Sequence, residues 1–229
     1  MQDAQIRRLD FGYFVRPAEE TDTGHPRVEP CLGYLVHHDR GTLLFDTGMG
    51  AAPEIDRHYR PRRQQLESAL AQAGCRLSDI DWVSNCHLHF DHCGGNPSVA
   101  DRPIFVQRRE LASARTTPDY TLPALVESGR YEEVDGEAEI APGVTLVPTP
   151  GHTDGHQSVV VRRRDGVVIV AGQSHDTASG YAADVLADRA RRDGHGDPLP
   201  PTPAWLARLQ ELDPSHVYFA HDHSVWRPS

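Results

Sequence analysis

The run from residue 87 to residue 92, His-Leu-His-Phe-Asp-His, constrains the fold of this chain more than any other feature of its sequence. Neutral imidazoles and carboxylates are the nitrogen and oxygen ligands that Zn²⁺ binds in proteins. His87 and His89 are two residues apart, so at the end of a strand their side chains leave on one face and can bind the same ion. Asp91 and His92 fall in the turn that follows and can face a second ion close by. The run therefore predicts a metal site.

The pattern of apolar and β-branched residues puts this run directly after a strand. We expect that strand over residues 80–86, and it would deliver His87 to its carboxyl end. Other strands are expected over 6–15, 31–38, 42–45, 104–106, 144–147, 158–163 and 167–171. Helical spacing of apolar residues predicts helices over 62–73, 108–115, 176–191 and 203–212. Strands interrupted by helices indicate an α/β fold in which two sheets pack together with helices outside.

Size and charge narrow the class of protein. The 229 residues fit a single α/β domain over 1–229. The formal net charge of -10 argues against a nucleic-acid partner, which would require a basic surface. No run of eighteen apolar residues is present, so no membrane span is expected. A small-molecule substrate is favoured, and the sequence does not indicate an oligomeric state.

The cysteines indicate a reducing compartment. None of the four forms a CxxC pair, and the first eight residues lack the apolar run of a signal peptide, so we expect a cytoplasmic protein with free thiols. Cys86 and Cys93 flank the histidine run. They can serve as soft zinc ligands or as small buried thiols, which is the commoner use of such positions.

Two further histidines follow predicted strands. His152 comes after the sequence Val-Pro-Thr-Pro-Gly over 147–151, and His221 comes after the apolar run 217–220. Either histidine alone is typical of a loop residue with its hydrogen bonds satisfied. Together with residues 87–92 they become candidate ligands, because a metal site assembled from distant segments draws its ligands from strand ends.

Three segments resemble one known family. They are 45–49 (Phe-Asp-Thr-Gly-Met), 84–96, which contains the histidine run, and 149–158, which contains Thr-Pro-Gly-His. Together they are similar to the metallo-β-lactamase superfamily, and within it to hydrolases of the N-acyl homoserine lactonase type. The segment 84–96 is the most specific of the three. The resemblance implies an αββα sandwich with the metal site at one edge.

The resemblance also implies a ligand set. It assigns His87, His89 and His152 to a first ion and Asp91, His92 and His221 to a second, with one or two Zn²⁺ ions per chain. Asp46 stands where the family has a carboxylate that accepts the other N–H of a ligand imidazole, which would orient that ring.

Gln173 departs from the family pattern. It follows the strand 167–171 at the position where the family has an aspartate that bridges the two ions. A neutral amide is a poorer ligand than a carboxylate and cannot offset positive charge. The change should weaken the binding of a second ion, so the site is expected to hold one metal more tightly than two. Gln173→Asp is predicted to tighten the second ion.

Asp176 is the second departure, because lactonase-like members often have a tyrosine at this position against the lactone ring. Its carboxylate can reach the second ion, donate a proton to the leaving group, or cap the helix predicted after it. The three roles remain open on the sequence alone.

The resemblance implies hydrolysis of a lactone or similar ester, in which Asp91 would orient the attacking water and carry its proton. N-acyl homoserine lactones, whose opening is called quorum quenching, are one such substrate class. Residues 48–61, rich in glycine, proline and charge, are expected to form a long loop whose Met49, Ile55 and Tyr59 cover an acyl chain. A thioester or phosphodiester substrate is an alternative, because one fold hosts many chemistries. A catalytically weak metal-binding protein is another, and Gln173 motivates it.

Overall fold

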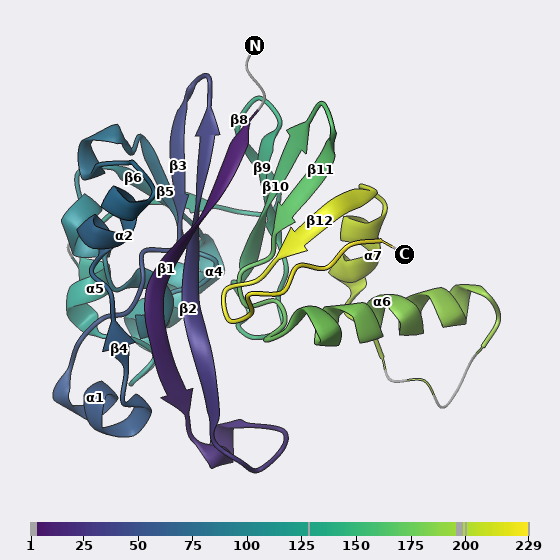
Figure 1. Ribbon diagram of the computed structural model, residues 1–229, viewed down its shortest axis with the longest axis horizontal. Helices are drawn as coiled ribbons and strands as arrows, with labels where there is room; N and C mark the ends of the chain where they lie inside the picture. Colours follow the sequence, from purple (N-terminus) through teal and green to yellow (C-terminus); the bar gives the residue numbers. More distant parts are fainter. Residues whose placement is uncertain (1–3, 128, 196–198, 200, 229) are drawn as a thin grey trace.

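The computed structural model of the chain describes residues 4–127, 129–195, 199 and 201–228. Its strands form two sheets that face each other (Figure 1). The larger sheet has the strand order β4-β1-β2-β3-β5-β6-β7, and the smaller one has the order β12-β11-β10-β9-β8. The strands of the larger sheet are β1 (Gln5–Arg16), β2 (Arg27–His38), β3 (Gly41–Phe45), β4 (Arg62–Arg63), β5 (Trp82–Ser84), β6 (Pro103–Gln107) and β7 (Arg130–Val134). Those of the smaller sheet are β8 (Ala138–Ala141), β9 (Val144–Pro148), β10 (Gln157–Arg163), β11 (Gly166–Val170) and β12 (Pro214–Tyr218).

Strand direction brings several strand ends to one edge of the sandwich. β3, β5, β6 and β7 are parallel to one another, and β11 is parallel to β12. β9 and β11 both pair with β10 in antiparallel fashion, so they run in the same direction. Backbone hydrogen bonds join the two sheets at this edge, from Gln157 to Cys86 at 2.8 Å and from Leu32 to Ala220 at 2.9 Å. Loops that follow these strands therefore meet at the same edge.

The alternation of side chains along the strands explains the layers. Leu32, Tyr34 and Val36 of β2 lie in the core between the sheets, whereas Leu35 lies in the core beneath the helices on the outer face. The residues of β10 alternate in the same way. Val159 belongs to the core between the sheets, and Val160 belongs to the core on the outer face of the smaller sheet. Burial of each such side chain contributes about 2 kcal/mol of transfer free energy. The predicted αββα sandwich is confirmed.

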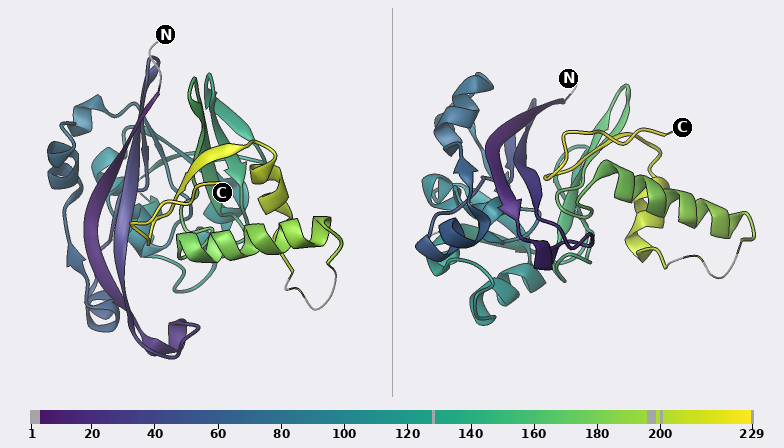
Figure 2. Two further views of the ribbon diagram at one scale, coloured as in Figure 1. Left: turned by 45° about the vertical axis from the view of Figure 1, so that its right-hand side comes forward. Right: turned by 60° about the horizontal axis from the view of Figure 1, so that its bottom comes forward.

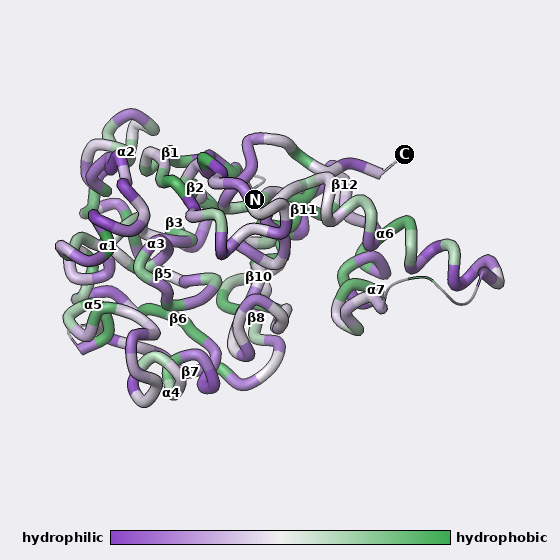
Figure 3. The backbone as a smooth tube through the Cα atoms, turned by 90° about the horizontal axis from the view of Figure 1, so that it is seen from below, coloured by the Kyte–Doolittle hydropathy of each residue, from purple (hydrophilic) through white to green (hydrophobic). Residues whose placement is uncertain are grey.

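The helices cover the two outer faces (Figure 2). Those packed on the larger sheet are α1 (Pro53–Tyr59), α2 (Leu66–Gln72), α3 (Phe90–Cys93), α4 (Arg108–Thr116) and α5 (Pro123–Glu127). The smaller sheet carries α6 (Ala178–Arg192), which extends away from the sandwich (Figure 3), and α7 (Ala204–Gln210). Short 3-10 turns are η1 (Ala18–Glu20), η2 (Leu77–Asp79) and η3 (Asn96–Val99). None of the described helices is long and apolar enough to cross a bilayer.

The expected elements agree with the structure except at four places. The expected strand 80–86 is shorter and spans only Trp82–Ser84 as β5. The expected loop 48–61 contains the helix α1, which begins with a proline at its first turn. The expected helix 62–73 begins only at Leu66, because Arg62 and Arg63 pair with β1 as the short strand β4. The expected helix 176–191 begins at Ala178. β7, β8 and α5 were not predicted, and the single domain over 1–229 remains a prediction.

Candidate metal centre

Five loops bring the predicted site residues to the edge where the strand ends meet. Asp46 follows β3, the run 87–92 follows β5, and His152 follows β9. Gln173 follows β11 and His221 follows β12. The side chains come from strands of both sheets, so the site exists only when the sandwich has formed.

His87, His89 and His152 form a first group, in which three imidazole nitrogens face one another. Nδ1 of His89 lies 2.9 Å from Nε2 of His87 and 3.2 Å from Nε2 of His152. Burial and the neighbouring imidazoles lower the pKa of His87 well below its ordinary value. Burial lowers the pKa of His89 to about 4 and, together with the nearby His89, that of His152 to about 3. Three neutral imidazoles whose lone pairs converge fit a Zn²⁺ site.

Asp91, His92 and His221 form a second group, which is buried. Nε2 of His92 lies 3.2 Å from Nε2 of His221, and Oδ2 of Asp91 lies 3.5 Å and 3.4 Å from these two nitrogens. Burial alone would raise the pKa of Asp91, but His92 and His221 hold it well below its ordinary value. Burial would lower the pKa of His92, but the carboxylates of Asp91 and Asp46 raise it. Without metal, the charges of Asp91 and His92 therefore stabilise each other, and Asp91 offers an ionised carboxylate as a ligand.

The far sides of the second group's rings are hydrogen bonded. Nδ1 of His221 lies 2.9 Å from the carbonyl oxygen of Pro30. A carbonyl can only accept, so Nδ1 donates and Nε2 presents its lone pair to the site. Oδ2 of Asp46 lies 3.0 Å from Nδ1 of His92, and Oδ1 accepts a hydrogen bond from the backbone of Cys86. Asp46 has a φ of 63°, a left-handed conformation that a non-glycine residue rarely adopts. Its position agrees with the orienting role that the family resemblance implies.

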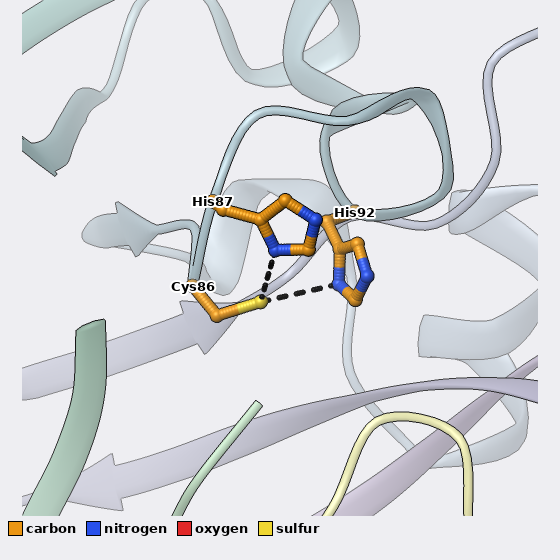
Figure 4. A group of neighbouring side chains, drawn as sticks. All are labelled: Cys86, His87 and His92. Atoms are coloured by element: carbon orange, nitrogen blue, oxygen red, sulfur yellow. Dashed lines mark hydrogen bonds between the residues drawn. The ribbon is translucent and has the colours of Figure 1, made fainter. Parts of the chain in front are cut away.

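Cys86 lies beside the rings of His87 and His92 (Figure 4). Its sulfur is 3.2 Å from Nδ1 of His87 and 3.2 Å from Nδ1 of His92, on the opposite side of each ring from the nitrogens that face the other ligands. Burial raises the pKa of Cys86 and of Cys93 to about 12, so both are thiols at neutral pH. The sulfur of Cys93 contacts backbone carbonyls of the ligand loop. This geometry favours the buried-thiol alternative for both cysteines.

Glu110 in α4 is a functional residue that the sequence reasoning missed. Its buried carboxylate accepts hydrogen bonds from the backbone of Leu88 at 2.7 Å, the hydroxyl of Tyr120 at 2.6 Å and the hydroxyl of Thr153 at 2.7 Å. Leu88 lies between two ligands of the first group, and Thr153 follows the third. Glu110 therefore joins the two loops that carry the first group. The available signal was a charged residue on the buried face of a predicted helix.

Gln173 and Asp176 contact each other. Oε1 of Gln173 lies 3.2 Å from Nε2 of His92, and its side-chain nitrogen donates to Oδ1 of Asp176 at 3.1 Å. Asp176 does not cap α6, because the side chain of Thr177 caps that helix by accepting from the backbone of Gly180. The capping role considered for Asp176 is therefore wrong.

A pocket of about 380 Å³ opens above the two groups. Its polar floor includes His89, Asp91, His152 and Gln173. Apolar wall residues include Phe14, Phe90 and Leu122 together with Ile55 and Tyr59 of α1. Met49, in contrast, packs against the core beneath the helices. Segment 48–61 thus contributes a helix to the pocket wall, with two of its three expected apolar residues in place.

Residues 26–229 match the family model of the metallo-beta-lactamase superfamily, and the chain belongs to this superfamily. An N-acyl homoserine lactonase of a Bacillus species is 29% identical over 170 residues, which cover 68% of each protein. A solved N-acyl homoserine lactone hydrolase, with the product N-hexanoyl-L-homoserine at its catalytic metal centre, superposes with a TM-score of 0.77 at 23% identity and covers 97% of this chain and 95% of that one. AidC, a dizinc quorum-quenching lactonase, superposes with a TM-score of 0.67 at 17% identity, with coverages of 95% and 87%.

Proposed function

We propose that this protein is a metal-dependent hydrolase that opens lactones, with N-acyl homoserine lactones as the substrate class. The observation that carries the proposal is the pocket, which is lined by His89, His152 and Asp91 from the two groups of metal-type ligands and by aromatic and aliphatic side chains. A molecule with a polar ring and an apolar acyl chain fits such a pocket. The curated lactonase relatives support the same substrate class.

His87, His89 and His152 would hold one Zn²⁺ ion, and Asp91, His92 and His221 would hold another. Imidazole nitrogens and one carboxylate are a donor set that suits zinc. Bound zinc would supply Lewis acidity toward the ester carbonyl and lower the pKa of water at the site. The four free cysteines, all buried, support a location in the reducing cytoplasm.

Asp91 is the residue best suited to handle the proton of the attacking water. Asp91 is 5% exposed and borders the pocket, so one side of it is open to a bound molecule. Its lowered pKa keeps it anionic at neutral pH, so it can accept a hydrogen bond from water and orient its lone pair toward the carbonyl carbon.

Asp176 is less suited to the proton-donor role considered from the sequence. Its two oxygens accept hydrogen bonds from Gln173 and from the guanidinium of Arg27. Burial alone would raise the pKa of Asp176, but Gln173, Arg16 and Arg27 hold it below its ordinary value. An ionised carboxylate has no proton to give to a leaving alkoxide.

A pH-indicator assay on purified, zinc-loaded protein tests the proposal. N-hexanoyl homoserine lactone and simple lactones should release one proton for each ring opened. His152→Ala should lower the rate at least about a hundredfold, because it removes a ligand of the first group. His25→Ala, which changes an exposed histidine in the loop between β1 and β2, is the matched control and should leave the rate unchanged. Protein with full zinc occupancy that opens neither lactones nor other esters would instead be a metal-binding protein.

A further inference from the structure

The side-chain amide of Gln173 has one orientation that its neighbours permit. An ionised carboxylate accepts hydrogen bonds and cannot donate them. The amide nitrogen of Gln173 must therefore face Oδ1 of Asp176, which lies 3.1 Å away. The amide oxygen must then face Nε2 of His92, at 3.2 Å. The polarity of the amide toward the second group is therefore set by Asp176.

The backbone holds Gln173 in place as well. Its backbone nitrogen donates to Nε2 of His156 at 3.1 Å. The preceding Gly172 has a φ of +57°, and a Cβ there would lie 2.4 Å from Cβ of Cys86. These contacts hold the backbone at residue 173, so a side chain of the length of glutamine reaches Asp176.

Asp176 is in turn held by an ion network from the larger sheet. Its Oδ2 accepts from the guanidinium of Arg27 at 2.6 Å, and Arg27 also binds Glu29 at 2.7 Å. Glu29 is 2% exposed and also binds Arg16 through two hydrogen bonds of 2.7 Å and 2.8 Å. Arg16 also pairs with Glu20, and Arg27 also pairs with Asp22, both at 3.7 Å. The network therefore has four carboxylates for two guanidinium groups and leaves no cation free to offset a further negative charge.

We propose that Asp176 is a positioning residue: its carboxylate orients the amide of Gln173 and makes a second carboxylate at position 173 unfavourable. Residues 173 and 176 together therefore carry one negative charge. A carboxylate at 173 would be buried and would face the carboxylate of Asp176, which is 41% exposed, without a donor between them. Two like charges at hydrogen-bond distance repel, and water at the exposed side of Asp176 screens only part of this repulsion. Consequently, a negative charge at 173 should tighten metal binding only when residue 176 is neutral, which revises the expectation from the sequence that Gln173→Asp alone tightens the second ion. The expected effect on metal binding rests on the proposed metal centre, whereas the repulsion between residues 173 and 176 does not.

A double-mutant cycle tests the coupling between the two positions. The four proteins are the wild type, Gln173→Glu, Asp176→Asn and the variant with both changes. Glutamate keeps the length of glutamine and adds only charge, and asparagine can donate to the new carboxylate. Glu67→Gln, on the exposed side of α2, is the control for a change of charge elsewhere.

Thermal unfolding in EDTA measures the coupling between residues 173 and 176 in the metal-free protein. Gln173→Glu should lower the unfolding midpoint by about 5 °C, and adding Asp176→Asn should recover most of that loss. Additive effects in the cycle would overturn the proposal. Asp176→Ser also removes the charge and replaces Asp176→Asn in the cycle if the asparagine variants do not fold by circular dichroism.

Competition with a chromophoric zinc chelator measures the zinc affinity of the same four proteins. Gln173→Glu alone should bind zinc no more tightly than the wild type, and the double variant should bind its weaker zinc equivalent about tenfold more tightly than Asp176→Asn. Equal tightening by Gln173→Glu with and without Asp176 would contradict the proposal. If no protein binds zinc, the metal centre fails, whereas the unfolding cycle still decides whether residues 173 and 176 are coupled.

Discussion

The two ligand groups differ in what holds them. The first group consists of three neutral imidazoles, of which His89 and His152 border the pocket, and Glu110 fixes their loops through backbone and hydroxyl hydrogen bonds. The second group is buried, includes the anion of Asp91, and is oriented by the carboxylate of Asp46 and the amide of Gln173. A side chain removed from the first group therefore leaves mainly a missing ligand. A side chain removed from the second group also leaves buried charges without a partner.

Truncation of one histidine in each group should give the largest contrast. His92→Ala should destabilise the metal-free protein by about 3 kcal/mol, because Asp46 and Asp91 lose the cation between them. His152→Ala should change the stability of the metal-free protein by less than about 1 kcal/mol, since it leaves no buried charge without a partner. Both should abolish most hydrolysis. Urea unfolding in EDTA measures the difference, and equal losses of stability would contradict the comparison.

Glu110→Gln should have a smaller effect, confined to the first group. The uncharged amide can accept fewer of the three hydrogen bonds, which should cost about 2 kcal/mol of stability and about tenfold in zinc affinity. Tyr120→Phe, which removes one of the three donors, should cost less than about 1 kcal/mol. Urea unfolding in EDTA and chelator competition measure the two quantities. An unchanged zinc affinity in Glu110→Gln would show that the loops hold their positions without this carboxylate.

The smallest effect is expected at the pocket wall. Ile55 of α1 is 8% exposed and lines the pocket above the first group. Ile55→Ala should lower kcat/KM for a long-chain acyl homoserine lactone about threefold relative to a short-chain one, because it removes apolar contact with the chain only. Rates on N-hexanoyl and N-decanoyl substrates give the ratio. A uniform loss on both would mean that Ile55 supports the fold rather than the acyl chain.

The ligand groups could be predicted because their signals are local. The run 87–92 carries four of the six proposed ligands at fixed spacing after a strand, and strand direction explains why the loops of His152 and His221 reach the same edge. The contact between Arg27 and Asp176 joins residues 149 positions apart, so no local pattern reveals it. Glu110 had a local signal, as a charged residue on the buried face of a predicted helix, but its partners come from other loops and could not be predicted.

The missed elements also have physical reasons. α1 has a single buried residue, Ile55, so it lacks the apolar stripe that predicts a helix. The side chain of Arg63 holds it in place by donating to the backbone of Gly50 and to Asp56. β7 is an edge strand with the charged sequence Arg-Tyr-Glu-Glu-Val, and only its pairing with β6 makes it a strand.

The most direct test of this account is a zinc titration of the metal-free protein against a chromophoric chelator. The neutral Gln173 predicts one tight zinc equivalent and a second that binds at least about tenfold more weakly. Two equally tight equivalents would contradict the argument from charge. No binding above that of the variant with both His92→Ala and His152→Ala would contradict the metal centre itself.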